Sequence, residues 1–166
     1  MGKYILVIAV CILLVACSKN TEVENNILLG FSESSINAQP GDLIEISIIF
    51  ENCPEPIFGM SFQIEYDNSI ISFVDSTGVI QGDYFSENSL SFCNEAEGVI
   101  HLAFTQVQSE EMITGSGIIG KIYFHVLTSG STQMEIINSS LHFYDAGGNE
   151  VDIPDLILSN CEININ

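Results

Sequence analysis

The sequence predicts an all-β fold, a sandwich of two sheets with about nine strands in total. From Phe31 onward, apolar and polar residues alternate, which is the pattern of strands that bury one face. Residues that favour turns, mainly Gly, Asp, Asn and Ser, separate these segments. No segment carries a sustained apolar stripe of helical period. Because each strand has one apolar face, a second sheet must cover it.

The first strands are expected at residues 42–50, 58–67 and 70–74. The first should point inward with Ile44, Ile46, Ile48 and Phe50. The second should do so with Phe58, Met60, Phe62, Ile64 and Tyr66. A turn at residues 75–78 closes the third strand.

The later strands continue this pattern. Segments 90–93 and 99–107 flank a hairpin loop at 94–98 that contains Gly98. Segment 118–126 should direct inward Ile118, Ile122, Phe124 and Val126. Shorter strands are expected at 134–137, 141–144, 156–158 and 161–165. On the outward side, Glu45 and Lys121 form an exposed ion pair if their strands are neighbours.

The charge balance excludes one class of partner. The chain has 22 acidic residues, three lysines and no arginine, for a formal net charge of −19. Such a surface repels a phosphate backbone, so nucleic-acid binding is not expected, and anionic lipid surfaces are disfavoured too. Three readings of the acidity stay open: a solvated surface, Ca²⁺ binding, or steering of a basic partner.

The N-terminus predicts export. Lys3 precedes an uncharged apolar run, residues 4–14, which is too short to span a membrane. The run ends in Leu14-Val15-Ala16-Cys17, which resembles the lipobox of a bacterial lipoprotein signal. The resemblance implies removal of residues 1–16 and acylation of Cys17, and several acyl chains make a stable anchor. A plain secretory signal is the alternative.

Residues 17–30 are then the lipidated cysteine and a short polar tether in front of a domain at 31–166. The expected location is the cell envelope, and Ser18 after the cysteine favours the outer membrane or cell surface by analogy with enteric bacteria. Export permits a disulfide, but Cys53, Cys93 and Cys161 cannot all pair. No Cys-x-x-Cys is present to begin a zinc or redox site.

Four segments together resemble the cohesin domain family, namely residues 38–42, 66–74, 115–126 and 143–151. They read Ala-Gln-Pro-Gly-Asp, Tyr-Asp-Asn-Ser-Ile-Ile-Ser-Phe-Val, Gly-Ser-Gly-Ile-Ile-Gly-Lys-Ile-Tyr-Phe-His-Val and Phe-Tyr-Asp-Ala-Gly-Gly-Asn-Glu-Val. The resemblance implies a nine-stranded jelly-roll sandwich with immunoglobulin-like architecture. It also implies a non-catalytic module that docks dockerin modules of polysaccharide-degrading enzymes.

The chain departs from the family at two points. A single domain follows the expected lipid anchor, whereas cohesins usually occur as repeats or with anchoring modules. Type I cohesins carry an Asn and an Asp that contact dockerin on the strand before Tyr-Asp, and the matching outward positions here are Gly59 and Ser61.

The resemblance places the recognition face on the outward side of one sheet. Alternation predicts that this side presents Ser61, Gln63, Glu65, Ser89, Ser91, His101, Ala103, Thr105 and Glu135. The small residues Ser61 and Ala103 would admit a partner helix. The plain alternative is an ordinary solvated sheet face.

Catalysis and cofactors have little support. His101, His125 and His142 each lie on a predicted strand, and neither His-Glu-x-x-His nor Gly-x-Ser-x-Gly is present. The chain is therefore predicted not to be an enzyme. A weak Ca²⁺ candidate is the late turn with Asp145, Asn149, Glu150, Asp152 and Asp155, although the same residues suit a plain turn.

Two alternatives to dockerin binding remain. A carbohydrate-binding lipoprotein would need exposed rings, and without Trp the plausible ones are Tyr84, Phe85, Tyr123 and Tyr144. A structural lipoprotein would use the sandwich as a spacer, with no dockerin partner.

Overall fold

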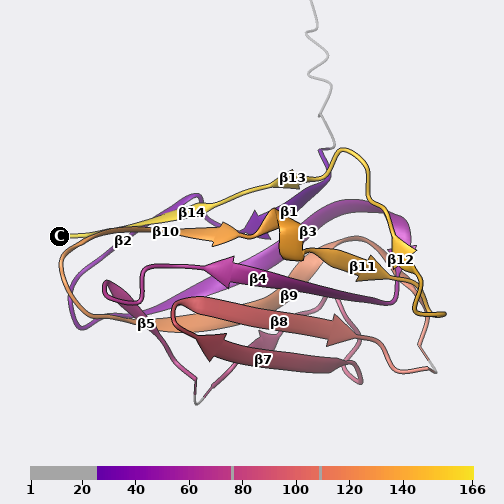
Figure 1. Ribbon diagram of the computed structural model, residues 1–166, viewed down its shortest axis with the longest axis horizontal. Helices are drawn as coiled ribbons and strands as arrows, with labels where there is room; N and C mark the ends of the chain where they lie inside the picture. The colour runs from indigo at the N-terminus through magenta and orange to yellow at the C-terminus, as the bar shows by residue number, and fades with distance from the viewer. Residues whose placement is uncertain (1–25, 76, 109) are drawn as a thin grey trace, which may run out of the picture.

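The computed structural model describes residues 26–75, 77–108 and 110–166, and it confirms the all-β sandwich of two sheets (Figure 1). The expected signal segment, Cys17 and residues 18–25 of the tether lie outside the described residues. Within the described ranges, no helix has the length and apolar character needed to cross a membrane.

The first sheet has six strands and is built around one long antiparallel pair, β3 (Leu43–Ile57) with β9 (Ile113–Val126). β1 (Leu28–Phe31) lies beside β3 and in turn pairs with β13 (Ile157–Leu158). β5 (Ile71–Phe73) and β6 (Ile80–Gln81) both pair with β9 on its other side.

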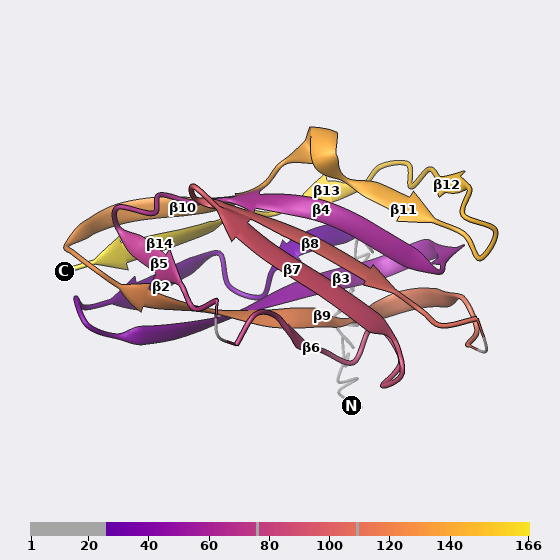
Figure 2. The ribbon, with the colours of Figure 1, turned by 60° about the horizontal axis from the view of Figure 1, so that its bottom comes forward.

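The second sheet has eight strands, with β4 (Gly59–Glu65) near its middle. On one side of β4 lie β8 (Val99–Thr105) and then β7 (Leu90–Ala96). On the other side lie β10 (Gly130–Ile136) and β11 (His142–Tyr144), with η1 (Asn138–Ser140) between them. The sheet is completed by β12 (Glu150–Val151), β14 (Cys161–Ile165) and β2 (Ser35–Ala38). Figure 2 shows the two sheets as stacked layers.

Alternating side chains from both sheets fill one continuous core. The expected inward residues of β3 are buried, and so are Met60, Phe62, Ile64 and Tyr66. Aromatic rings join the layers: Tyr66 of one sheet meets Phe124 of the other edge-to-face, with ring centroids 5.0 Å apart. Among the described residues, every member of this core lies between Leu29 and Ile165. Because residues 26–166 contain this continuous core, we expect them to fold on their own.

One inward prediction on β9 is wrong. Ile118 is half-buried, whereas Ile119 is fully buried. The ladder shows the cause, because Ile48 pairs with Gly120 and Ile49 with Ile118, which leaves Ile119 as an extra residue. This β-bulge reverses the alternation, and side chains before it in β9 face the other way.

The start of the domain also differs from the prediction. Leu28–Gly30, assigned above to the tether, belong to β1, where Leu29 is fully buried. β2 was not predicted either. β3 continues beyond Phe50 to Ile57 through Pro54 and Pro56, because only Cys53 and Ile57 pair with β9 in this stretch.

Two smaller features follow from local chemistry. The hairpin loop between β7 and β8 has two residues rather than five, because Glu97 and Gly98 take positive φ angles of 55° and 85° and form a type I′ turn. Phe58, expected inward, sits at the bend between β3 and β4 and is only half-buried.

The predicted ion pair is confirmed, since Lys121 Nζ lies 2.7 Å from Glu45 Oε1 on the outward side of the first sheet. Tyr123 donates a hydrogen bond to the other oxygen of Glu45 at 2.5 Å. Cys53, Cys93 and Cys161 are all free thiols.

The core predicts a large difference between two substitutions. Phe124→Ala removes a fully buried ring and should lower the free energy of unfolding by about 3–5 kcal/mol. Leu43→Ala, at a side chain 57% exposed on the neighbouring strand, should change it by less than about 0.5 kcal/mol. Urea unfolding of both variants measures this, and equal losses would contradict the layered core.

Tyr66 predicts a stability loss in alkali. Burial and the neighbouring Glu95 carboxylate, to which its hydroxyl donates a hydrogen bond at 3.1 Å, raise the pKa of Tyr66 to about 12. An unfolded tyrosine ionises near pH 10, so the contribution of neutral Tyr66 is complete below about pH 10 and is lost as the pH rises to about 12.

Between pH 8 and pH 11, the wild-type chain should therefore lose about 1 kcal/mol more unfolding free energy than Tyr66→Phe, which cannot ionise. Urea unfolding at both pH values measures the difference. Parallel losses in the two proteins would show that Tyr66 titrates normally.

Candidate functional site

The outward side of the second sheet brings most of the predicted site residues together. Strand register aligns them in rows that cross β7, β8, β4 and β11. One row contains Phe92, Ala103, Ser61 and His142. The next contains Leu90, Thr105, Gly59 and Tyr144. We call this side of the sheet the outer face.

A shallow trough runs along the middle of the outer face. Its centre has small residues: Ser61 of β4 lies directly opposite Ala103 of β8, and Gly59 lies two positions before Ser61 on β4. Larger side chains stand on either side, from β7 and from β11. A hollow of about 520 Å³ in the trough is lined by both kinds, including Ser61, Phe92, His101, Ala103, Ser140 and His142.

The turn η1 forms a raised edge beside the trough. It interrupts what would be one strand: β10 pairs with β4 at Glu135 and Ile136, and β11 resumes the pairing only at His142. The gap in the ladder is filled by Ser140, whose Oγ accepts a hydrogen bond from the backbone N–H of Gln63 at 2.9 Å. The backbone N–H of Gln63 in the second sheet thus has its hydrogen-bond partner in a side chain of η1.

One end of the outer face is acidic. Glu65 lies directly opposite Glu135 on the neighbouring strand, and both side chains are exposed. Like charges in this position cost stability. Lys121 is the only Lys or Arg from residue 26 to residue 166, and it lies on the other sheet. This end of the face therefore presents uncompensated negative charge.

Seven of the nine predicted face residues lie on the outer face as expected: Ser61, Gln63, Glu65, His101, Ala103, Thr105 and Glu135. Ser89 and Ser91 do not. Ser91 pairs with the buried Phe104 and points to the core side of the sheet, and Ser89 lies in a turn before β7. The two-residue turn sets this phase, because it pairs Ala96 with Val99.

The same phase puts two large apolar side chains on the outer face that the sequence analysis missed. Leu90 is 63% exposed and Phe92 is 61% exposed. Recognition of Glu97-Gly98 as a two-residue hairpin turn would have revealed them, since the register then follows. His142 and Tyr144 were missed as well. Their rings stack with centroids 6.3 Å apart, and His142 Nδ1 lies 2.7 Å from Glu150 Oε1.

In the turn at residues 145–149, the Asp145 side chain bonds to groups of the turn itself and is not left free to bind Ca²⁺. One carboxylate oxygen of Asp145 accepts backbone N–H groups of Gly147 and Asn149, each at 2.8 Å. The Asn149 amide also donates to this carboxylate, and these bonds lower the pKa of Asp145. Glu150 faces His142 instead. Across residues 26–75, 77–108 and 110–166, no three His, Cys, Asp or Glu side chains group so that they could hold a metal ion.

The rings expected for sugar binding are mostly covered. Tyr84 and Phe85 are buried, because they pack against Phe50 and Phe104. Tyr123 lies on the first sheet, away from the outer face, and its hydroxyl donates a hydrogen bond to Glu45. Only Tyr144 lies on the outer face, so the four rings form no common stacking platform.

Comparison with solved structures places the fold among cohesins. A non-cellulosomal cohesin from Archaeoglobus fulgidus is similar with a TM-score of 0.64 and 22% identity, over 85% of this chain and 90% of that one. The third cohesin of ScaC from Acetivibrio cellulolyticus, solved in complex with the ScaB dockerin, gives 0.69 and 18%, over 84% and 98%. The cohesin of a Coh-OlpA–Doc918 complex from Clostridium thermocellum gives 0.66 and 22%, over 86% and 100%.

At these sequence identities, similarity to the solved structures shows only a shared fold. The family is shown by the sequence comparison. A comparison with curated protein sequences gives no match. The model of the cohesin domain family, in contrast, matches residues 31–165, which is most of the chain and nearly all of the described sandwich. The chain therefore belongs to the cohesin domain family.

Proposed function

We propose that this chain is a non-catalytic docking module that binds a dockerin-type protein module through the outer face. The observation that carries the proposal is the trough: small central residues flanked by exposed apolar side chains on the sheet of a cohesin domain. Two of the similar structures are cohesins in complex with dockerins, which supports a partner of the same class.

The trough suits an α-helix better than a flat surface would. Gly59, Ser61 and Ala103 keep the floor low, so the backbone of a helix can approach the sheet closely. Leu90 and Phe92 stand along one side and His142 and Tyr144 along the other. Large exposed apolar side chains next to a central cavity are typical of residues that dominate binding energy.

The acidic end adds specificity. Glu65 and Glu135 face solvent without a neighbouring cation, and their mutual repulsion falls when a basic side chain comes between them. A partner with Lys or Arg at the corresponding end of its helix is therefore favoured. The absence of the Asn and Asp of type I cohesins at positions 59 and 61 points to a divergent dockerin partner.

We further propose that Cys17 anchors the module to the cell envelope. The apolar run and lipobox-like sequence before Cys17 support this location. Eight residues lie between Cys17 and Asn26, and even fully extended this stretch spans only about 30 Å. The docked enzyme would then be kept close to the membrane. Labelling with radioactive palmitate, lost in Cys17→Ser, tests this step.

Blocking the trough should abolish capture of the partner. Ser61→Arg or Ala103→Arg fills the floor and should weaken binding on the order of 100-fold. Immobilised residues 26–166 and the secreted dockerin-bearing proteins of the same organism provide the assay. Ser72→Arg on β5 of the other sheet is the matched control and should bind normally. Equal capture by all variants, or retention on insoluble polysaccharide instead, would overturn the proposal.

The exposed apolar residues should contribute to binding and not to folding. Phe92→Ala should weaken partner binding by about 10- to 100-fold while leaving the unfolding free energy within about 0.5 kcal/mol. Leu90→Ala is compared with Leu43→Ala, because both leucines are more than half exposed but on opposite sheets. Calorimetric titration measures binding, and equal effects of the two leucines would contradict the assignment of the face.

A further inference from the structure

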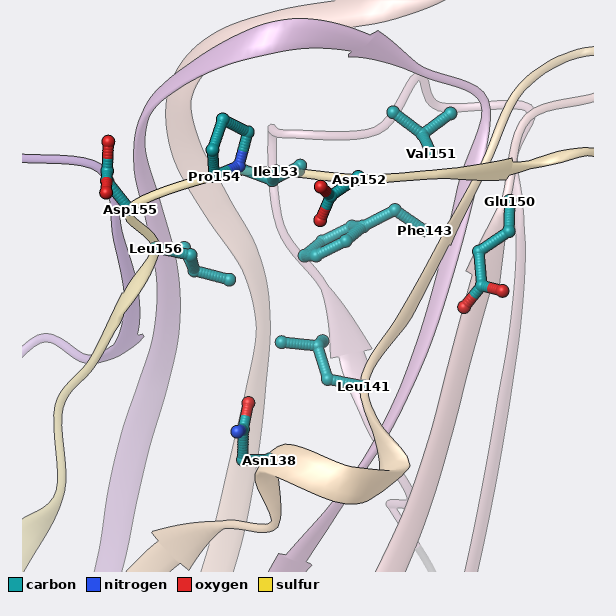
Figure 3. Close-up of a pocket in the computed structure, with 10 residues that line it drawn as sticks. All are labelled: Asn138, Leu141, Phe143, Glu150, Val151, Asp152, Ile153, Pro154, Asp155 and Leu156. Atoms are coloured by element: carbon teal, nitrogen blue, oxygen red, sulfur yellow. The ribbon is translucent and has the colours of Figure 1, made fainter.

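A second hollow opens on the core side of β11, opposite the trough. It has a volume of about 630 Å³ (Figure 3). One wall is formed by η1 and β11, and the other by the segment from Glu150 to Leu156. The hollow exists because η1 interrupts the strand, and because the chain crosses here from β12 in the second sheet to β13 in the first. We call it the side pocket.

The floor of the side pocket is apolar. Phe143 and Ile153 are buried members of the core, and Leu141 and Leu156 pack against the core while staying half-exposed. Figure 3 shows Leu141, Phe143 and Leu156 converging on the same space from different segments. The phenyl ring of Phe143 is buried against Phe50, with centroids 5.6 Å apart, so it offers little open face.

The rim of the pocket is polar and acidic. Asn138 and Asp152 direct their side chains toward the hollow, and Asp155 stands at its edge (Figure 3). Among the described residues, none of these three side chains is engaged in a hydrogen bond or ion pair, whereas Glu150 is turned away to His142. Asp155 takes a left-handed φ of 60°, a conformation that is uncommon outside glycine.

This combination selects one ligand chemistry. Carboxylates above an apolar floor repel anions, and a neutral sugar would desolvate them without finding a ring face on which to stack. An alkylammonium group satisfies both parts. Its methylene stem covers the leucines, and its –NH₃⁺ donates a hydrogen bond to the Asp152 carboxylate.

We propose that the side pocket is a binding site for an alkylammonium group, the chemistry shared by a lysine side chain and a free aliphatic diamine. The site lies on the core side of β11 and involves none of the residues of the trough. The proposal for the side pocket can therefore be tested independently of dockerin binding.

The test is a titration of ¹⁵N-labelled residues 26–166 with n-pentylammonium chloride, followed by amide chemical shifts. We expect saturable shifts at Leu141, Phe143 and Leu156, and little effect at the trough. 1-Pentanol, which has the same stem without the charge, should bind at least about fivefold more weakly. Absence of saturation, or equal binding of the alcohol, would overturn the proposal.

Two variants make the test specific. Asp152→Asn should weaken n-pentylammonium binding about fivefold or more. Asp75→Asn changes the net charge equally at an exposed loop away from the pocket and should leave binding unchanged. Equal effects of the two variants would show non-specific attraction to an acidic protein and overturn the site. Pentane-1,5-diamine and the peptide acetyl-Gly-Lys-Gly-amide are then compared, and the tighter ligand identifies the source of the group.

Discussion

The antiparallel pairing of β3 with β9 is the contact on which the rest of the sandwich depends. These are the two longest strands, and their register aligns Ile44 with Phe124 and Ile46 with Ile122, so that one continuous apolar surface faces the second sheet. Every other strand of the first sheet is attached to this pair directly, or through β1 in the case of β13. Because buried apolar area is the main stabilising term in folding, the position of the second sheet follows from this surface. The strands of the second sheet are fixed by packing on the apolar surface of β3 and β9, and the outer face is the opposite side of these strands.

That dependence explains why β4 can carry small residues at its centre. Met60, Phe62 and Ile64 anchor the strand from the core side, so its outward positions do not have to supply core contacts and can hold the small residues Gly59 and Ser61. A sheet held from one side can present whatever a partner needs on the other. The acidic pair Glu65 and Glu135 reflects the same freedom, since its cost in stability is carried by the core beneath it.

The sequence predicted those features that depend on simple alternation. The inward residues of β3 and β4, the Glu45–Lys121 pair and seven residues of the outer face followed from the period of two and the family resemblance. The errors occur where one residue shifts the phase. The extra residue Ile119 turns Ile118 away from its predicted inward position. The two-residue turn at Glu97 and Gly98 places Leu90 and Phe92 on the outer face, where Ser91 was expected. A bulge or a tight turn depends on backbone angles and tertiary pairing, which alternation alone does not encode. The side pocket was missed for a related reason, since it is formed by segments that meet only through the crossover between sheets.

The hairpin of β7 and β8 has a further consequence for how copies of the chain associate at high concentration. β7 is an outermost strand, and the hydrogen bonds of the pair closed by Ala96 and Val99 leave the backbone groups of Ser91, Cys93 and Glu95 directed outward. An open strand edge is a template on which another copy can add its own strand and begin a fibre. Glu95 and Glu97 place negative charge at this edge, and a second copy brings the same charge to the same place. Like charge at this edge thereby protects the chain from polymerising with itself.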